Sequence, residues 1–176
     1  LVDMFRLRAQ DKRLQLSCVL GEEVPRYAHA DEGKLRQILI NLLGNAVKFT
    51  QEGGVQMEAH YAAGQLVVKV ADSGPGMAPE ELETLFEAFV QTQSGRRTHT
   101  GTGLGLAISQ QFAQLMGGRI QVQSAVDQGS TFRLDLPLAL AQADAVPFAK
   151  ADRRVVGLAQ GQTEWRILIV DDQEDN

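Results

Sequence analysis

The ten residues "NLLGNAVKFT", Asn41 to Thr50, close a longer run, "DEGKLRQILINLLGNAVKFT", that begins at Asp31. Apolar residues recur along this run at the three- and four-residue spacing of one helix face, and Asp31 stands where a helix N-cap belongs. The apolar positions are Leu35, Ile38, Leu39, Leu42, Leu43, Ala46 and Val47. The run therefore predicts an amphipathic helix over residues 32–49.

The other face of this helix carries Asn41, Asn45 and Lys48, which are spaced i, i+4 and i+7 and so lie on one side. Asparagine is a poor residue for a helix interior, worse than Lys, Glu or Gln by up to about 0.5 kcal/mol. A face that only met water would favour those better helix formers. Taken alone, the helix still allows a solvated polar stripe, and the rest of the chain has to decide whether this is a binding face.

Bulk composition narrows the class of protein. The chain has 176 residues, of which 44% are hydrophobic and 22% charged, as in a globular protein with one domain and room for part of a second. A net charge of −5 argues against a nucleic-acid partner or direct contact with an anionic membrane. We find no membrane-spanning apolar run and no signal peptide. The single cysteine, Cys18, excludes an internal disulfide and suits a cytoplasmic location. Cys18 is also predicted to be a buried strand residue. Because the chain begins at Leu1 without Met, we expect a fragment.

Periodicity predicts the remaining elements. They are a charged helix over residues 1–13, a half-buried strand over 14–20, a hairpin over 55–70, a short helix from Pro79, a helix over 104–116 and a hairpin over 120–136. Residues 139–165 carry few signals for order and predict a linker.

Asp72 ends an apolar strand face. It continues the inward parity of Leu66, Val68 and Val70, so its carboxylate should lie at the edge of the core. A buried carboxylate without a partner is costly, and we therefore expect a hydrogen-bond donor beside it. The simpler alternative is that Asp72 caps the turn "DSGPG" that follows.

The segment "GTGLGLA", Gly101 to Ala107, opens the predicted helix over 104–116. Backbone N–H groups at a helix start bind anions, and glycines let a phosphate approach them. The spacing matches neither the Rossmann fingerprint nor the P-loop. On its own the segment is weak evidence for a phosphate site.

Four motifs in order resemble the GHKL nucleotide-binding family. They are "NxxxNAxKF", "DxGxG", "GTGLGL" and the Gly129-Ser130-Thr131 step in the last hairpin. The resemblance covers residues 14–137 and is closest to the catalytic, ATP-binding domain of sensor histidine kinases. The segment "LFEAFVQ", residues 85–91, is similar to that family's phenylalanine box. The resemblance implies a two-layer α/β (α+β) sandwich, with a mixed, largely antiparallel sheet covered on one face by helices and a flexible lid over ATP.

The resemblance also implies roles for particular residues. Asn41 and Asn45 would face the triphosphate and help to hold magnesium, since an amide oxygen is a neutral hard ligand. Lys48 would meet the phosphates, and Asp72 would accept from the exocyclic amine of adenine. Arg97, from the lid, would approach the γ-phosphate. The other residues implied to contact the nucleotide are Gly74, Gly76, Met77, Phe89, Gly101, Thr102, Gly103, Leu104, Gly105, Leu106 and Thr131. Strand alternation nevertheless directs Thr131 outward, opposite to Phe132.

Position 41 separates rival functions within the family. Hydrolytic relatives carry glutamate there as a base for water, whereas Asn41 cannot take a proton. This favours a kinase over a hydrolytic ATPase, and a third alternative is a module that binds nucleotide without catalysis. His29, His60 and His99 lie outside any phosphoacceptor helix of the histidine-kinase type. We therefore expect the fragment to bind Mg-ATP but not to phosphorylate itself, its acceptor being a dimerisation helix domain of the same protein.

The end of the chain, "RILIVDDQEDN", resembles the first strand of a response-regulator receiver domain, with Asp171 and Asp172 as its paired acids. The alternative is a linker that ends in acidic residues. The predicted organisation is thus a kinase domain over 1–138, a linker over 139–165 and a truncated receiver strand over 166–176. This arrangement implies a hybrid sensor kinase whose partner downstream is a receiver domain or response regulator. We expect the apolar strand 166–170 to dock, with the free edge near 14–20 as the predicted receptor.

Overall fold

The computed structural model of the chain describes residues 1–90 and 102–141. The predictions for Arg97, His99 and Gly101 lie outside the described residues. So do those for most of the linker and for the receiver-like strand.

A five-stranded sheet forms one layer of the domain. Its strands are β1 (Gln15–Leu20), β3 (Gly54–Ala62), β4 (Gln65–Asp72), β5 (Arg119–Ser124) and β6 (Ser130–Pro137). They run in the order β1-β3-β4-β6-β5. The β1–β3 pair is parallel and the other three pairs are antiparallel. The sheet is therefore mixed and largely antiparallel, as predicted.

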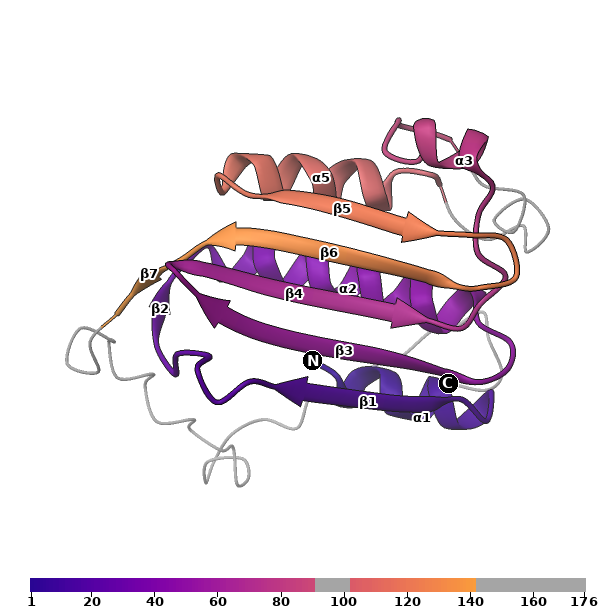
Figure 1. Cartoon of the computed structure of the whole chain (residues 1–176), viewed down its shortest axis with the longest axis horizontal. Helices are drawn as coiled ribbons and strands as arrows, with labels where there is room; N and C mark the ends of the chain where they lie inside the picture. The colour runs from indigo at the N-terminus through magenta and orange to yellow at the C-terminus, as the bar shows by residue number, and fades with distance from the viewer. Residues whose placement is uncertain (91–101, 142–176) are drawn as a thin grey trace, which may run out of the picture. The chain divides into compact units, whose positions relative to one another are not determined.

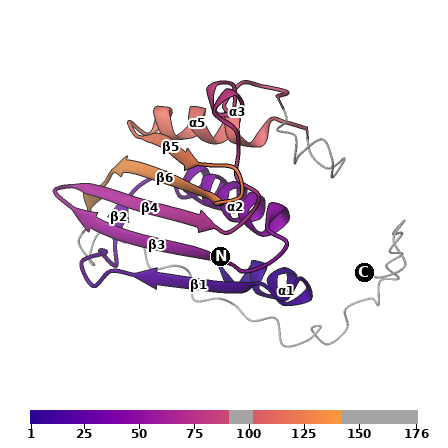
Figure 2. The same cartoon turned by 45° about the vertical axis from the view of Figure 1, so that its right-hand side comes forward.

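Helices form the second layer. They are α1 (Asp3–Asp11), α2 (Glu32–Phe49) and α5 (Gly105–Leu115). A short helix, α3 (Pro79–Glu83), follows β4. Figures 1 and 2 show α2 and α5 against the same face of the sheet, with α1 beside β1. A separate two-stranded sheet joins β2 (Ala28–His29) to β7 (Ala139–Leu140). The predicted two-layer α/β sandwich is confirmed.

The core lies between α2 and the middle of the sheet. Ile38, Leu42 and Leu43 of α2 are fully buried, and so are side chains of β4 and β6. Those side chains are Val68, Val70, Leu134 and Leu136. Burial of each such side chain contributes about 1.5–3 kcal/mol, so the apolar face of α2 is firmly attached to the sheet. Its opposite, polar face is held in place as a consequence.

Both ends of α2 are capped. At the start, the Lys34 N–H donates to Oδ1 of Asp31 at 2.9 Å, as the sequence predicts. At the end, the buried Thr50 hydroxyl donates to the Ala46 carbonyl at 2.7 Å. The ammonium of Lys12, which lies between α1 and β1, binds further carbonyl groups at this end. Its Nζ donates to the carbonyl oxygens of Val47 (2.9 Å), Lys48 (2.7 Å) and Thr50 (3.1 Å).

Two expectations need correction. Cys18 is exposed rather than buried, and Leu20 is 64% exposed, because β1 is an edge strand and α1 covers only its beginning, where Leu14 is buried. In addition, Ala139 and Leu140, predicted to start the linker, form β7.

Candidate functional site

A pocket opens where the C-terminal half of α2 meets the end of β4 and the start of β6; we name it the Asp72 pocket. Its lining residues are Asn45, Ala46, Phe49, Asp72, Pro75, Gly76, Met77, Leu85, Leu106, Ser130 and Phe132. Most of these side chains are apolar, and Asp72 is the one carboxylate among them. A mainly apolar pocket with a single acidic acceptor fits a flat, apolar ligand that carries a hydrogen-bond donor.

Asp72 is half-buried at the end of β4. Its Oδ1 accepts from the Gly74 N–H at 2.9 Å, so the carboxylate does cap its own turn, which was the simpler alternative. Burial raises the pKa of Asp72, and hydrogen bonds from the backbone N–H groups of Gly74 and Ser130 act in the opposite direction. The carboxylate therefore caps a turn and also lines a pocket, where a donor from a ligand would satisfy it further.

The loop after Asp72 is in close contact with the turn between β5 and β6. Gly76 has φ 65°, and a Cβ built on it would overlap the Ala125 carbonyl oxygen. Only glycine fits this conformation and this close approach. Beside it, the Met77 N–H donates to the Ser124 hydroxyl at 2.9 Å. The loop is thus tied to β5 while Gly76 and Met77 line the pocket.

The predicted role of Thr131 does not agree with the strand register. In the β4–β6 pair, Asp72 lies opposite Ser130, and Ala71 lies opposite Thr131. Residues opposite one another in an antiparallel pair share a face, so Ser130 is on the Asp72 side and Thr131 is on the other face of the sheet. Ser130 lines the Asp72 pocket in its place.

Phe89, which the resemblance assigns to the nucleotide site, is 74% exposed and does not line the Asp72 pocket. Its backbone has φ 65°, and its N–H donates to the Gly103 carbonyl at 3.1 Å. This backbone arrangement accompanies a side chain directed away from the core. Leu85, from the same phenylalanine-box segment, is buried and lines the pocket instead.

The two asparagines of α2 have different surroundings. Asn45 lines both the Asp72 pocket and an open groove between α1 and α2, which we name the α1–α2 groove. Asn41 connects two helices, since its Nδ2 donates to the Gly105 carbonyl at 2.7 Å and to the buried Ser109 hydroxyl at 2.9 Å. The amide nitrogen of Asn41 is thereby occupied, and any contact with a ligand would come from its oxygen.

Lys48 completes the polar face of α2. It lines the α1–α2 groove, and its ammonium lies 4.8 Å from the centre of the Phe49 ring. Partial burial lowers the pKa of Lys48. An anion in the groove would oppose that effect, because a negative charge stabilises the ammonium form.

Residues 102–106, from the glycine-rich segment, divide between two sites. Thr102, Leu104 and Gly105 line a second groove, between α2 and α5, whereas Leu106 lines the Asp72 pocket. Gly103 packs against the backbone of residues 89–90. The predicted glycine-rich helix start is therefore next to Asn41, at the end of the site remote from Asp72.

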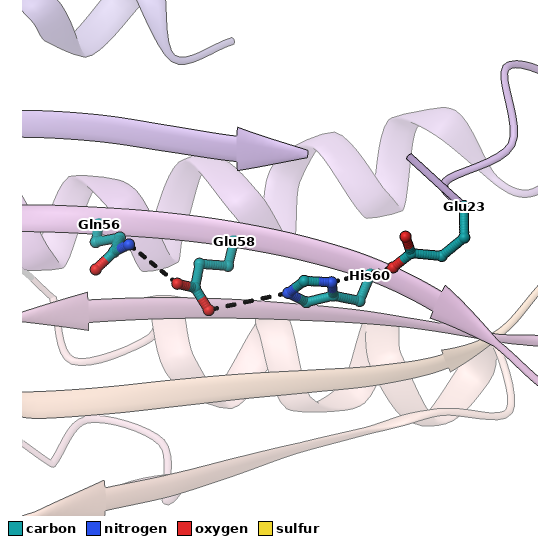
Figure 3. A network of polar contacts seen from close by, with 4 residues as sticks. All are labelled: Glu23, Gln56, Glu58 and His60. Atoms are coloured by element: carbon teal, nitrogen blue, oxygen red, sulfur yellow. Dashed lines mark hydrogen bonds and ion pairs between the residues drawn. The ribbon is translucent and has the colours of Figure 1, made fainter. Parts of the chain in front are cut away.

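Within residues 1–90 and 102–141, no group of three or more His, Cys, Asp or Glu side chains could hold a metal ion. Figure 3 shows a network of polar contacts on the sheet, in which Nδ1 of His60 is 3.0 Å from Glu23 and Nε2 is 4.0 Å from Glu58. Glu58 and His60 alternate with the buried Met57 and Ala59 along β3, so these two side chains lie on the sheet face opposite the helices. His60 therefore belongs to a network of polar contacts on the surface of the sheet. No helix in the part of the chain described here could cross a membrane.

Comparison with known proteins agrees with this geometry. Residues 30–140 match the family described as "Histidine kinase-, DNA gyrase B-, and HSP90-like ATPase". The chain is 36% identical to the sensor protein TorS of Escherichia coli over 165 residues, which is 94% of this chain and 17% of TorS. It is 40% identical to the aerobic respiration control sensor protein ArcB of Escherichia coli over 139 residues, 77% of this chain and 18% of ArcB.

A third relative is the sensor histidine kinase AruS of Pseudomonas aeruginosa, 44% identical over 140 residues, 76% of this chain and 14% of AruS. The chain thus spans less than a fifth of the length of each of these relatives.

Among solved structures, full-length ShkA in complex with AMPPNP aligns with a TM-score of 0.71 at 40% identity, over 81% of this chain and 29% of ShkA. The catalytic domain of the histidine kinase ThkA aligns with a TM-score of 0.66 at 27% identity, over 77% of this chain and 87% of that domain. The chain therefore belongs to the family of histidine kinase-, DNA gyrase B- and HSP90-like ATPases, and it is an ATP-binding catalytic module of the sensor histidine kinase type.

Proposed function

We propose that this domain binds Mg-ATP with the adenine in the Asp72 pocket and presents the γ-phosphoryl group to a histidine on a dimerisation helix domain of its parent protein. The observation that carries the proposal is the environment of Asn41. At the place where a hydrolytic relative would need a base, the chain has an amide whose nitrogen is bonded to Gly105 and Ser109. An amide cannot accept a proton from water, so the phosphoryl group is kept for a better nucleophile.

At the base end, Asp72 would accept a hydrogen bond from the exocyclic amine of adenine. Its raised pKa reflects a carboxylate that has lost water and gained only backbone donors. Ser130 takes the role first assigned to Thr131, since it shares a face with Asp72. Gly76 and Met77 would contact the ring, with Phe132 and Leu106 as apolar walls.

At the phosphate end, the donor set fits magnesium. Mg²⁺ prefers oxygen ligands and is usually held by one or two protein groups together with substrate phosphates. Asn45 supplies an amide oxygen where the Asp72 pocket meets the α1–α2 groove, and the oxygen of Asn41 is the second candidate. When bound, the metal would neutralise phosphate charge. Lys48 would bind the phosphates, and Gly101, Thr102, Gly103, Leu104 and Gly105 would border them, with Arg97 at the γ-phosphate.

Labelled ATP tests the proposal directly. The chain, incubated with ATP labelled at the γ-phosphate and magnesium, should bind nucleotide, release little inorganic phosphate and remain unlabelled. Addition of the dimerisation helix domain of the parent protein should move the label to that domain. Rapid phosphate release by the chain alone would favour the hydrolytic alternative. Binding without transfer to any such helix domain would favour a module that only binds nucleotide.

We also propose that the parent protein is a hybrid sensor kinase and that this domain works in the cytoplasm. Support comes from the sequence of residues 166–176, which resembles the start of a receiver domain. On this proposal, a receiver domain or response regulator takes the phosphoryl group next.

A further inference from the structure

Ser124, the last residue of β5, lies just behind the Asp72 pocket and is not among its lining residues. Its hydroxyl makes three contacts. It accepts from the Met77 N–H at 2.9 Å, donates to the Gly129 carbonyl at 2.8 Å, and lies 3.0 Å from the Ser130 hydroxyl. None of the four motifs that identify the family contains Ser124.

The proton count fixes the direction of the third contact. A serine hydroxyl has one proton to donate and two lone pairs to accept with. Because the Ser124 proton is donated to the Gly129 carbonyl, the Ser130 hydroxyl must be the donor in their contact. The proton of Ser130 is then directed at Ser124, and the lone pairs of Ser130 are left to accept from a ligand or a water molecule in the Asp72 pocket.

The three partners come from two segments that form the pocket. Met77 and Ser130 both line it. Gly129 packs so closely on the end of β4 that a Cβ built there would overlap the Asp72 carbonyl oxygen. A single hydroxyl therefore joins the loop after Asp72 to Gly129, just before β6, and to Ser130, the first residue of β6.

We propose that Ser124 is a positioning residue for the base end of the nucleotide site. It touches no ligand, and it acts through Met77 and Ser130 by fixing the backbone of the one and the hydroxyl direction of the other. The inference rests on the proposed function, in that it takes the Asp72 pocket as the adenine site. The site thus depends on a side chain outside the residues that contact the nucleotide.

The test compares three variants at position 124. Ser124→Thr keeps the hydroxyl, Ser124→Val has the shape of threonine without it, and Ser124→Ala removes it with the least change in volume. We expect Ser124→Ala and Ser124→Val to weaken both ADP and ATP binding by about tenfold, the size expected for the loss of one or two neutral hydrogen bonds. Ser124→Thr should bind close to wild type. The ratio of ATP to ADP affinity should not change, because the phosphate end is untouched.

Ser73→Ala is the matched control. The Ser73 hydroxyl also braces a strand to a turn, since it accepts from the Gly54 N–H at 2.9 Å and donates to the Glu52 carbonyl at 2.9 Å. It follows Asp72 directly in the chain but does not line the Asp72 pocket. Urea unfolding of each variant, with calorimetry at a temperature where all are folded, separates loss of stability from loss of affinity. If Ser124→Ala binds ADP no more weakly than Ser73→Ala, or if Ser124→Thr is as weak as Ser124→Val, the role of Ser124 is wrong.

A change in the ATP to ADP ratio would also overturn the role, because it would place the effect at the phosphates. Failure of the proposed function has a different signature. If Asp72→Asn leaves ADP affinity unchanged, the Asp72 pocket is not the base site, and the inference about Ser124 falls with it. If Asp72→Asn weakens ADP while Ser124→Ala does not, only the positioning role is lost.

Discussion

The two ends of the site are built differently. At the Asp72 pocket, side chains and backbone groups from β4, β5, β6 and the loop after Asp72 are already bonded to one another. At the other end, Asn45 and Lys48 line an open groove of about 940 Å³, with Asn41 bonded to α5 beside it. The base end is preorganised, which favours affinity, since little ordering has to accompany binding. The phosphate end offers separate polar groups that a nucleotide, a metal and an acceptor domain would bring together.

The largest expected effect is the loss of nucleotide affinity in Asp72→Asn, which tests the base end of the site. The substitution replaces an acceptor by a group that presents N–H to the adenine amine, so ADP and ATP should both bind about 10–150-fold more weakly, equivalent to roughly 1.5–3 kcal/mol. Calorimetry with both nucleotides measures the loss. Asp127→Asn, which makes the same change at an exposed residue of the β5–β6 turn, is the control and should bind like wild type. Equal affinities of the Asp72 variant and wild type would remove the adenine assignment.

Asn45→Ala should act only where magnesium is involved. Loss of one oxygen ligand should reduce the magnesium-dependent gain in ATP affinity by about tenfold, within the range seen when metal sites are weakened. Binding of ADP without magnesium should stay close to wild type. Titrations of ATP at several magnesium concentrations provide the measurement. A uniform loss for all nucleotides, with or without the metal, would show that the two ends of the site are not separable in this way.

Lys12→Met tests how the phosphate end is supported. The ammonium of Lys12 donates to three carbonyl groups at the end of α2, next to Lys48. A cation at a helix C-terminus contributes about 1 kcal/mol in a partly buried setting, and we expect urea unfolding to show a loss of that size. Arg36→Met removes an exposed pair with Glu32 on the same helix and should cost less, about 0.3–0.5 kcal/mol. If the two variants have the same free energy of unfolding, Lys12 stabilises the C-terminus of α2 no more than an exposed ion pair would.

Periodicity predicted much of the fold because α2, β3, β4 and β6 each have one apolar face against a common core. The same parity predicted the inward position of Asp72 at the end of β4. Parity indicates which face a residue is on, but not whether another element covers that face. For this reason the exposure of Cys18, on an edge strand, could not be read from alternation.

The site was less predictable, for two physical reasons. First, some contacts depend on packing between elements far apart in sequence, as with Asn41 and its bonds to Gly105 and Ser109. Second, a transferred motif can be one residue out of register, as with Thr131 and Ser130. In that case the strand alternation was the better signal, because it had already placed Thr131 on the outer face. The positive φ of Phe89 had no counterpart in the sequence.

The smallest expected effect concerns the free energy of unfolding without nucleotide. Here Asp72→Asn should exceed wild type, whereas wild type should bind nucleotide more tightly. Burial raises the pKa of Asp72 above its ordinary value of 3.8. Between that value and the raised one, the folded state holds the proton more tightly than the unfolded chain, so this contribution to stability is lost as pH rises through the window. At neutral pH the buried charge therefore destabilises the empty domain, and Asp72→Asn should be somewhat more stable than wild type. Below pH 3.8 that advantage should vanish.

Urea unfolding of both proteins from pH 3 to pH 7 isolates the effect, since other carboxyl groups cancel in the difference. With saturating ADP at neutral pH the order should invert, because only wild type gains the full free energy of binding. Two results would contradict this account: a stability difference between the two proteins that does not change with pH, or a wild type that is the more stable without nucleotide. Either result would mean that the backbone N–H groups alone satisfy the Asp72 carboxylate, so that it is not an unsatisfied acceptor for adenine.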